Sequence, residues 1–196
     1  TLPEKWLRIT APVGRQALYA ILSERPLKAD DDLHRAFVAD GALDERLLDL
    51  ASQIDLVYSP LVDFKEFPEQ VDVTLVEGAI SSEDDLTKIR MIRERTRVLV
   101  SLGDCAVTGN VPSMRNPFST ETILERVYLN ESLFRREIPT IHVPRLLERV
   151  RPVHAVVKVD VYVPGCPPSA DVIYHLLAEL IAGNQPVLTG KTRFGA

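Results

Sequence analysis

Apolar and polar residues alternate along the middle and the end of the chain in a pattern that predicts strands and helices in turn. Short runs of Val, Ile and Leu predict strands, and each run stops at a turn rich in Gly or Pro. The predicted strands are Ile54–Tyr58, Val71–Val76, Arg97–Leu102 and Val156–Val163. Because these runs are nearly continuous in apolar residues, they are typical of a parallel sheet covered on both faces. The pattern therefore predicts a doubly wound α/β fold.

The segment between the second and third predicted strands, Ser81–Arg95, has the signature of an amphipathic helix. Ser82 precedes Asp85 by three residues, which is the spacing of a helix-capping pair, and Ile89 and Ile92 fall on one face.

A last helix is predicted from about Ser169 to Ala182, because Gly183-Asn184 follows it as a stop signal. Asn110–Pro117 and Pro139–Pro152 are predicted to be loops and irregular structure.

The N-terminal part follows the same logic less regularly. Lys5–Thr10 is a candidate first strand that leads into Ala11-Pro12-Val13-Gly14. Three helices are expected after it, at Ala17–Glu24, Asp32–Ala39 and Leu43–Ser52.

Length and composition limit the classes of protein to consider. The chain has 196 residues, 45% of them hydrophobic, which suits one domain. The formal net charge of −5 disfavours a nucleic-acid partner. The expectation is also for no membrane span, since no apolar run approaches ~20 residues, and for no secretory signal in Thr1–Trp6. The two cysteines are too few for a disulfide framework, so a cytoplasmic protein with reduced thiols is expected.

Polar or reactive side chains follow three of the predicted strands: Glu77, Cys105 and Cys166. In an open parallel sheet, ligands bind outside the carboxyl ends of the strands. Gly103 and Gly165 precede the two cysteines and allow sharp turns close to a ligand. These residues therefore mark a candidate site.

Prolines stiffen the loop around Cys166 at positions 164, 167 and 168. A rigid loop that presents a thiolate beside backbone N–H groups suits an iron–sulfur cluster, because hydrogen bonds to sulfur tune the cluster's potential. The alternatives are that each cysteine is a small buried residue, or that the two form a disulfide, which a reducing compartment disfavours.

Several motifs resemble those of a known family. Residues 163–168 (VPGCPP) are similar to a signature shared by [NiFe]-hydrogenase small subunits and the 20-kDa-type subunit of respiratory complex I. Residues 76–78 resemble the family's VEG turn. Residues 102–107 (LGDCAV), 110–116 (NVPSMRN) and 153–160 resemble, within that superfamily, the small subunit of the soluble NAD-reducing hydrogenase. The resemblance extends from about Asp44 to Val187.

The resemblance implies a flavodoxin-like domain, over residues 44–196, that holds one [4Fe-4S] cluster near the nickel–iron site of a large subunit. It implies that the subunit does not activate hydrogen itself but passes electrons towards flavin- and iron–sulfur-containing diaphorase subunits that reduce NAD. Cys105 and Cys166 match the third and fourth cluster ligands. The positions expected beside the cluster are Glu77, Gly78, Gly103, Asp104, Pro164, Gly165 and Pro167. The candidate contacts with the large subunit are Pro112, Met114, Arg115, Pro117 and Phe118.

The N-terminal segment, residues 1–43, departs from the family. The family supplies its first two ligands from a CxxC loop after the first strand, and this chain has no cysteine there. Aligning on Asp44-Glu45-Arg46 places the pair near Leu33 and Ala36, whereas aligning on the first strand places the loop at Ala11–Gln16. Three explanations stay open: a divergent segment with an altered or absent cluster, a changed or incorrectly determined stretch, or ligands from another subunit.

Two other functions compete with a hydrogenase electron-transfer subunit. One is a cluster-less scaffold of the same fold, including a version that binds FMN through a phosphate loop at Thr10–Gly14. The other is the complex I subunit itself, although the adjacent cysteines typical of that family are absent.

Overall fold

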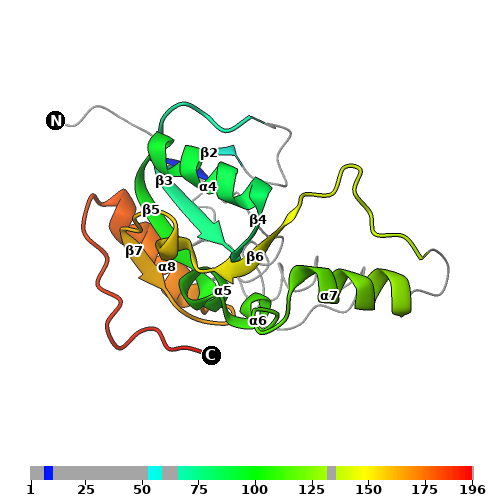
Figure 1. Cartoon of the computed structure of the whole chain (residues 1–196). Coiled ribbons are helices and arrows are strands. Elements are labelled where there is room, and N and C mark those ends of the chain that lie inside the picture. Colours follow the sequence, from blue (N-terminus) through cyan, green and yellow to red (C-terminus); the bar gives the residue numbers. More distant parts are fainter. Residues whose placement is uncertain (1–6, 11–52, 59–65, 132–135, 196) are drawn as a thin grey trace, which may run out of the picture.

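A parallel sheet lies at the centre of the part of the chain that the computed structural model describes, residues 7–10, 53–58, 66–131 and 136–195 (Figure 1). Within those residues the strand order is β2-β1-β3-β5-β7, and every neighbouring pair is parallel. The strands are β1 (Leu7–Thr10), β2 (Ile54–Tyr58), β3 (Val71–Glu77), β5 (Thr96–Leu102) and β7 (Val161–Val163). Counted along the chain, this is the 2-1-3-4-5 order of flavodoxin-like folds, so the predicted fold class is confirmed.

Strand β1 occupies the inner position predicted for Lys5–Thr10. It pairs with β2 on one side and with β3 on the other, where Thr10 lies opposite Thr74. Strands β1 and β3 therefore run towards the same edge of the sheet at the point where the strand order reverses, which is the usual ligand-binding position of this fold. The helices predicted between residues 17 and 52 lie outside the described residues.

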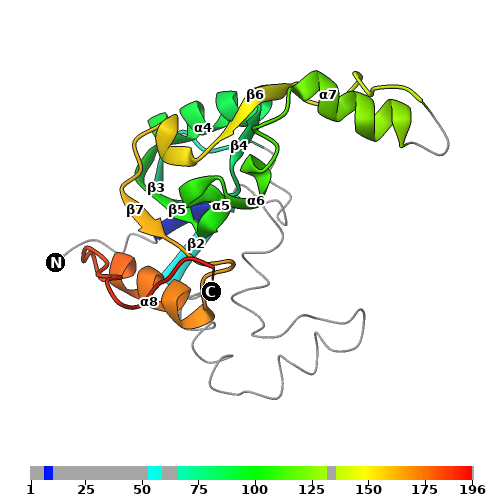
Figure 2. The ribbon, with the colours of Figure 1, turned by 60° about the horizontal axis from the view of Figure 1, so that its bottom comes forward.

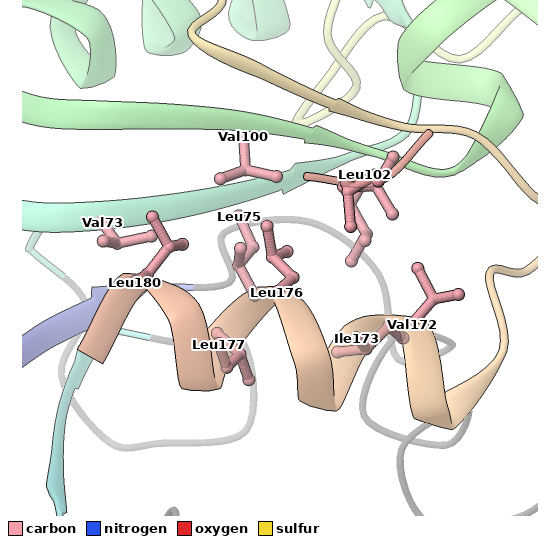
Figure 3. Packing of buried hydrophobic residues seen from close by; sticks show 11 residues of the cluster. Val73, Leu75, Val100, Leu102, Val172, Ile173, Leu176, Leu177 and Leu180 are labelled. Carbon is pink, nitrogen blue, oxygen red and sulfur yellow. The ribbon is translucent and has the colours of Figure 1, made fainter. Parts of the chain in front are cut away.

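Helices cover both faces of the sheet. Helix α4 (Glu83–Arg95) lies on one face and α8 (Ala170–Ile181) on the other (Figure 2). Side chains of β3 and β5 that point to the α8 face pack on one row of that helix (Figure 3). The cluster includes Val73, Leu75, Val100 and Leu102 from the strands and Val172, Ile173, Leu176, Leu177 and Leu180 from the helix. Each such fully buried side chain contributes about 1.5–3 kcal/mol of transfer free energy.

The helix boundaries follow from their caps. Ser82 caps α4: its hydroxyl accepts the Asp85 N–H at 3.1 Å, and the Asp85 carboxylate accepts the Ser82 N–H at 2.9 Å. Ser169 caps α8, and Gly183 follows the helix with φ +76°. Both helices were predicted within two residues of these ends, and the capping pair of α4 is confirmed.

The fourth predicted strand, Val156–Val163, is too long. The structure has a short 3-10 turn, η2 (Val153–Ala155), and regular pairing begins only at Val161. The cause is Asp160: its carboxylate accepts the Leu99 N–H at 2.9 Å, where a partner strand would offer a backbone carbonyl.

The two predicted loops also contain regular structure. Strand β6 (Leu146–Arg151) pairs antiparallel with β4 (Ile80–Ser82), and α6 (Asn110–Ser113) forms one helical turn. Helix α7 (Thr120–Leu124) continues as a π-helix, η1 (Glu125–Asn130), and projects away from the sheet (Figure 1). In the part of the chain described, no helix is both long and apolar enough to cross a bilayer.

Candidate functional site

The candidate site lies at the carboxyl edge of the sheet, where three neighbouring strands end. Glu77 is the last residue of β3, Cys105 lies in the first turn of α5 (Gly103–Thr108) directly after β5, and Cys166 lies in the loop after β7. Both cysteines are free thiols; that of Cys105 is half-buried and that of Cys166 is exposed. The topology thus brings together three residues spread over 90 positions of the sequence.

The Cys166 thiol is close enough to influence the ionisation of Cys105. Burial is the largest cause that raises the pKa of Cys105, and the neighbouring Cys166 thiol raises it further. The Val111 N–H, which donates to the Cys105 sulfur, opposes this shift, while the carboxylates of Glu77 and Asp104 add to it. A bound cation or metal cluster would reverse the balance, because it stabilises the thiolate.

Helix α6 supplies hydrogen-bond donors to both sulfurs. The Asn110 side-chain amide lies 3.9 Å from the Cys166 Sγ, and the next residue, Val111, donates its N–H to Cys105. Gly109 before them has φ +87°, which turns the chain from α5 into α6. Asn110 was not among the site residues predicted from the sequence; its position five residues after Cys105, behind a Gly turn, was the available signal.

The Cys166 loop needs glycine at position 165. Gly165 has φ +145°, and a Cβ there would lie 2.5 Å from the Pro168 Cα. The Cys166–Pro167 peptide bond is cis. Gly103, with φ +83°, lies directly against this loop, since a Cβ on it would be 3.5 Å from the Gly165 carbonyl oxygen.

Asp104 joins the two cysteine-bearing segments. It is 4% exposed, and its carboxylate accepts the Gly165 N–H at 2.7 Å while its own N–H donates to the Gly165 carbonyl at 2.8 Å. Its second oxygen accepts the Gly195 N–H at 2.7 Å. Gly78 (φ +85°) and the half-buried Pro164 complete the residues predicted beside the site.

The predicted large-subunit contacts fall into two kinds. Met114 and Phe118 are 71% and 59% exposed, Pro117 is exposed and Pro112 is half-buried. Arg115 is half-buried, and its Nη2 donates to the carbonyls of Ser81 and Leu147, which ties β4 to β6.

The thiols that the structure brings together fit half of a [4Fe-4S] site. Such a cluster takes four protein ligands, usually thiolates, and the whole sequence contains two cysteines. Within the described residues, no group of three or more His, Cys, Asp or Glu side chains is arranged to hold a metal ion. The positions that should carry the other two ligands, Ala11–Gln16 or Leu33–Ala36, lie outside the described residues, as does the FMN loop after Thr10.

The family model of the NADH ubiquinone oxidoreductase 20 Kd subunit matches residues 38–180. The delta subunit of the NAD-reducing hydrogenase HoxS of Cupriavidus necator is 39% identical over 72% of this chain and 70% of its own length. An iron-sulfur subunit of the F420-non-reducing hydrogenase of Archaeoglobus profundus is 28% identical over 74% of this chain; the chain spans about half (51%) of that relative.

Among solved structures, a chain of the NAD+-reducing [NiFe]-hydrogenase in the H2-reduced state superimposes with a TM-score of 0.79. The match has 29% sequence identity and covers 98% of this chain and 100% of that one. The chain therefore belongs to the family of the NADH ubiquinone oxidoreductase 20 Kd subunit and, within it, to the branch of the NAD-reducing [NiFe]-hydrogenase small subunits, which are oxidoreductase subunits.

Proposed function

We propose that this chain is the electron-transfer small subunit of a cytoplasmic, NAD-linked [NiFe]-hydrogenase, and that Cys105 and Cys166 are two ligands of its iron–sulfur cluster. The observation that carries the proposal is the convergence of both thiols at one edge of the sheet, each with a hydrogen-bond donor from α6. Family membership and a relative named as an iron–sulfur subunit support the same function. The Cupriavidus and Archaeoglobus relatives are both hydrogenase subunits, which favours a hydrogenase over a respiratory complex.

An iron–sulfur cluster bound here would supply one-electron transfer between a nickel–iron site and diaphorase subunits. Residues of this chain would bind the cluster and donate hydrogen bonds to its sulfur ligands. Cys105 and Cys166 offer sulfur ligands from two rigid turns, and Val111 and Asn110 donate hydrogen bonds towards those sulfurs. Such hydrogen bonds stabilise negative charge on sulfur and so raise the reduction potential of a bound cluster.

We expect the remaining two cluster ligands near the carboxyl end of β1. The family's CxxC loop follows the first strand, and β1 ends at Thr10 next to β3. Because Ala11–Gln16 holds no cysteine, this chain offers two thiolates and not four. A complete cluster therefore requires ligands of another kind or from another chain.

We place the large-subunit contact on the apolar residues that follow α6. Met114, Pro117 and Phe118 are exposed next to the cysteine edge, on the segment that links α6 to α7. Exposed apolar groups that are close together mark protein–protein contacts more often than isolated ones do. Arg115 holds this segment to β4 and β6 through hydrogen bonds to the Ser81 and Leu147 carbonyls.

Co-expression with a hydrogenase large subunit tests the proposal. We expect the anaerobically purified complex to contain about four irons attributable to this chain and to give an EPR signal on reduction. That signal should be lost in C105S and C166S and retained in D160N, a matched change in a carboxylate away from the thiols. An active complex in which this chain carries no iron would contradict the proposal.

The presence of only two cysteines favours one competing function, a cluster-less scaffold of the same fold. A scaffold would keep its assembly with the large subunit, and the activity of the complex, when both cysteines are replaced by serine. The double variant therefore separates the two functions in one preparation.

A further inference from the structure

The Asp104 carboxylate is the polar group that connects the segments around the thiols. Asp104 is buried, precedes Cys105 directly, and accepts hydrogen bonds from two backbone N–H groups distant in sequence. One belongs to Gly165, which precedes Cys166 directly, and the other to Gly195 near the end of the described chain. A single side chain thus holds three segments at the carboxyl edge of the sheet.

The contact with Gly165 is reciprocal. The Asp104 N–H donates to the Gly165 carbonyl at 2.8 Å, and the Gly165 N–H donates back to the Asp104 Oδ1 at 2.7 Å. Two bonds between the same pair of residues fix both distance and orientation, as a single bond does not. Asp104 and Gly165 are the immediate neighbours of Cys105 and Cys166. The same two hydrogen bonds therefore fix the relative position of the backbone segments that carry the two sulfur atoms.

The chemistry of this position requires a carboxylate. Both Asp104 oxygens accept a hydrogen bond from a backbone N–H at 2.7 Å. An asparagine has one acceptor oxygen, so its NH2 group would face one of the two N–H donors, and a buried donor left without an acceptor is costly. Asparagine therefore keeps the shape of the side chain while removing one of its two bonds.

We propose that Asp104 is the positioning residue that sets the separation of the Cys105 and Cys166 sulfur atoms. This role rests on the proposed function only for the identity of the group that the two thiols would bind, a cluster. The separation of the two sulfur atoms is a property of this chain alone. A two-thiol site with a fixed separation binds a bridging ligand more tightly than two independently mobile thiols, because less conformational freedom is lost on binding.

A trivalent arsenical measures that separation without iron. Phenylarsine oxide condenses with two thiols: two As–S bonds form, the As=O oxygen leaves as water with both thiol protons, and nothing is oxidised. We expect the reduced full-length wild-type chain to bind one equivalent. D104N should bind at least about tenfold more weakly, and C105S and C166S should lose the bridged form.

The control is D160N, which alters another carboxylate that accepts a backbone N–H of the sheet, that of Leu99 at 2.9 Å. Since Asp160 lies away from the thiols, D160N should bind phenylarsine oxide within about twofold of the wild type, at a temperature where circular dichroism shows both variants folded. If D104N fails to fold, D104E replaces it: both acceptor oxygens remain, but one extra methylene displaces Gly165, and weaker binding is again expected.

Folded D104N, or D104E in its place, that binds the arsenical as tightly as the wild type would overturn the proposal, as would equal weakening in D160N. The result is independent of the proposed function. A chain that shows the D104N effect but acquires no iron in the complex upholds the role of Asp104 and contradicts the cluster.

Discussion

At the scale of single residues, Gly165 is the position where the site depends most on backbone geometry. Its φ of +145° is accessible mainly to glycine, and a Cβ there would lie 2.5 Å from the Pro168 Cα. Its N–H and its carbonyl both bind Asp104. A change at Gly165 therefore acts on the conformation of the Cys166 loop and on its attachment to α5 together.

We predict that Gly165→Ala lowers the free energy of unfolding by about 3 kcal/mol or more, because both strain and backbone collision oppose it. Gly190→Ala is the matched control: Gly190 also has a left-handed φ, +77°, but open space surrounds its Cβ position. It should cost only about 1–2 kcal/mol. Urea unfolding of both variants measures the difference, and equal losses would contradict the role of the Pro168 contact.

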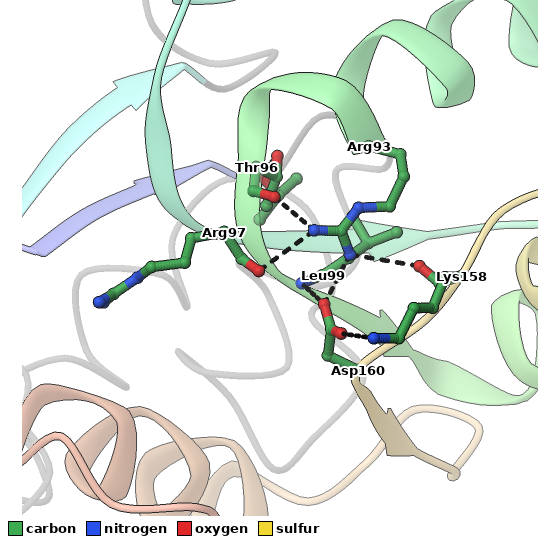
Figure 4. Close-up of polar contacts among 7 residues, drawn as sticks. Arg93, Thr96, Arg97, Leu99, Lys158 and Asp160 are labelled. Atoms are coloured by element: carbon green, nitrogen blue, oxygen red, sulfur yellow. Dashed lines mark hydrogen bonds and ion pairs between the residues drawn. The ribbon is translucent and has the colours of Figure 1, made fainter.

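Asp160 gives a second prediction, through pH. Partial burial pushes the pKa of Asp160 up, but the Leu99 N–H, the Arg93 hydrogen bond and the charges of Arg93 and Lys158 outweigh it, so that the pKa is lowered overall. Arg93 also donates to the carbonyls of Thr96, Arg97 and Lys158 and so joins the end of α4 to β5 and to the approach of β7 (Figure 4).

A folded-state pKa below the unfolded one means that the ionised carboxylate stabilises the fold above the unfolded pKa, and that this stability is lost as pH falls through the folded pKa. The difference in unfolding free energy between wild type and D160N should therefore be constant near neutral pH and shrink below about pH 4. E131Q, which removes the partner of Arg126 in an exposed pair, should change little at any pH. A difference for D160N that persists unchanged at acid pH would contradict the assignment.

At the scale of elements, the caps decide where the helices begin. The Ser82–Asp85 pair satisfies two backbone N–H groups at the start of α4, and Asp85 also accepts the Ser81 N–H at 3.0 Å. This position matters for the site because β4 and α4 follow directly after Glu77 and Gly78.

We predict that Ser82→Ala destabilises the protein by about 1 kcal/mol, the usual cost of a lost N-cap. Thr87→Ala is the control, since the Thr87 hydroxyl donates only to the Glu83 carbonyl within the same exposed helical turn; it should stay within about 0.5 kcal/mol. Thermal unfolding followed by circular dichroism distinguishes them, and a Ser82→Ala variant as stable as Thr87→Ala would contradict the capping role.

The elements that sequence could predict are those whose signal is local. Continuous apolar runs gave β2, β3 and β5, and capping residues gave α4 and α8. Strand β6 was not predicted from the sequence, because its burial pattern is irregular and its partner, β4, is a three-residue strand more than 60 positions earlier. The shortening of the strand at Val156–Val163 likewise depends on a side chain, Asp160, that replaces a backbone partner.

The candidate site was predictable to a similar extent. Cys105, Cys166 and Glu77 each follow a predicted strand, so the parallel order alone predicts that they lie at one edge of the sheet. Asp104 could be named as a neighbour of that edge, but its bonds to Gly165 and Gly195 join residues 61 and 91 positions away. Such contacts depend on the folded loops and have no local pattern.

At the scale of the whole molecule, the strand order directs β1 towards the same edge of the sheet as the two cysteines. Strand β1 lies between β2 and β3, and its last residue, Thr10, pairs with Thr74, three residues before the end of β3 at Glu77. The structure presents two thiols at the ends of β5 and β7, while the sequence at Ala11–Gln16 after β1 has no thiol. Under the proposed function, a complete cluster depends on which groups supply the two ligands that the family's CxxC loop provides.

The helical segment formed by α7 and η1 projects away from the sheet (Figure 1). Val127 in η1 is exposed, and so are Ile141 and Val143 in the chain that leads into β6. In the chain before α7, the Arg115 bonds to the Ser81 and Leu147 carbonyls hold β4 and β6 together.

The most direct test is to locate iron in the purified complex by anomalous X-ray scattering. We predict an iron centre bonded to the Sγ atoms of both Cys105 and Cys166, at the carboxyl ends of β5 and β7. Iron bonded to neither sulfur, or two thiols that face each other with no metal between them, would contradict the account.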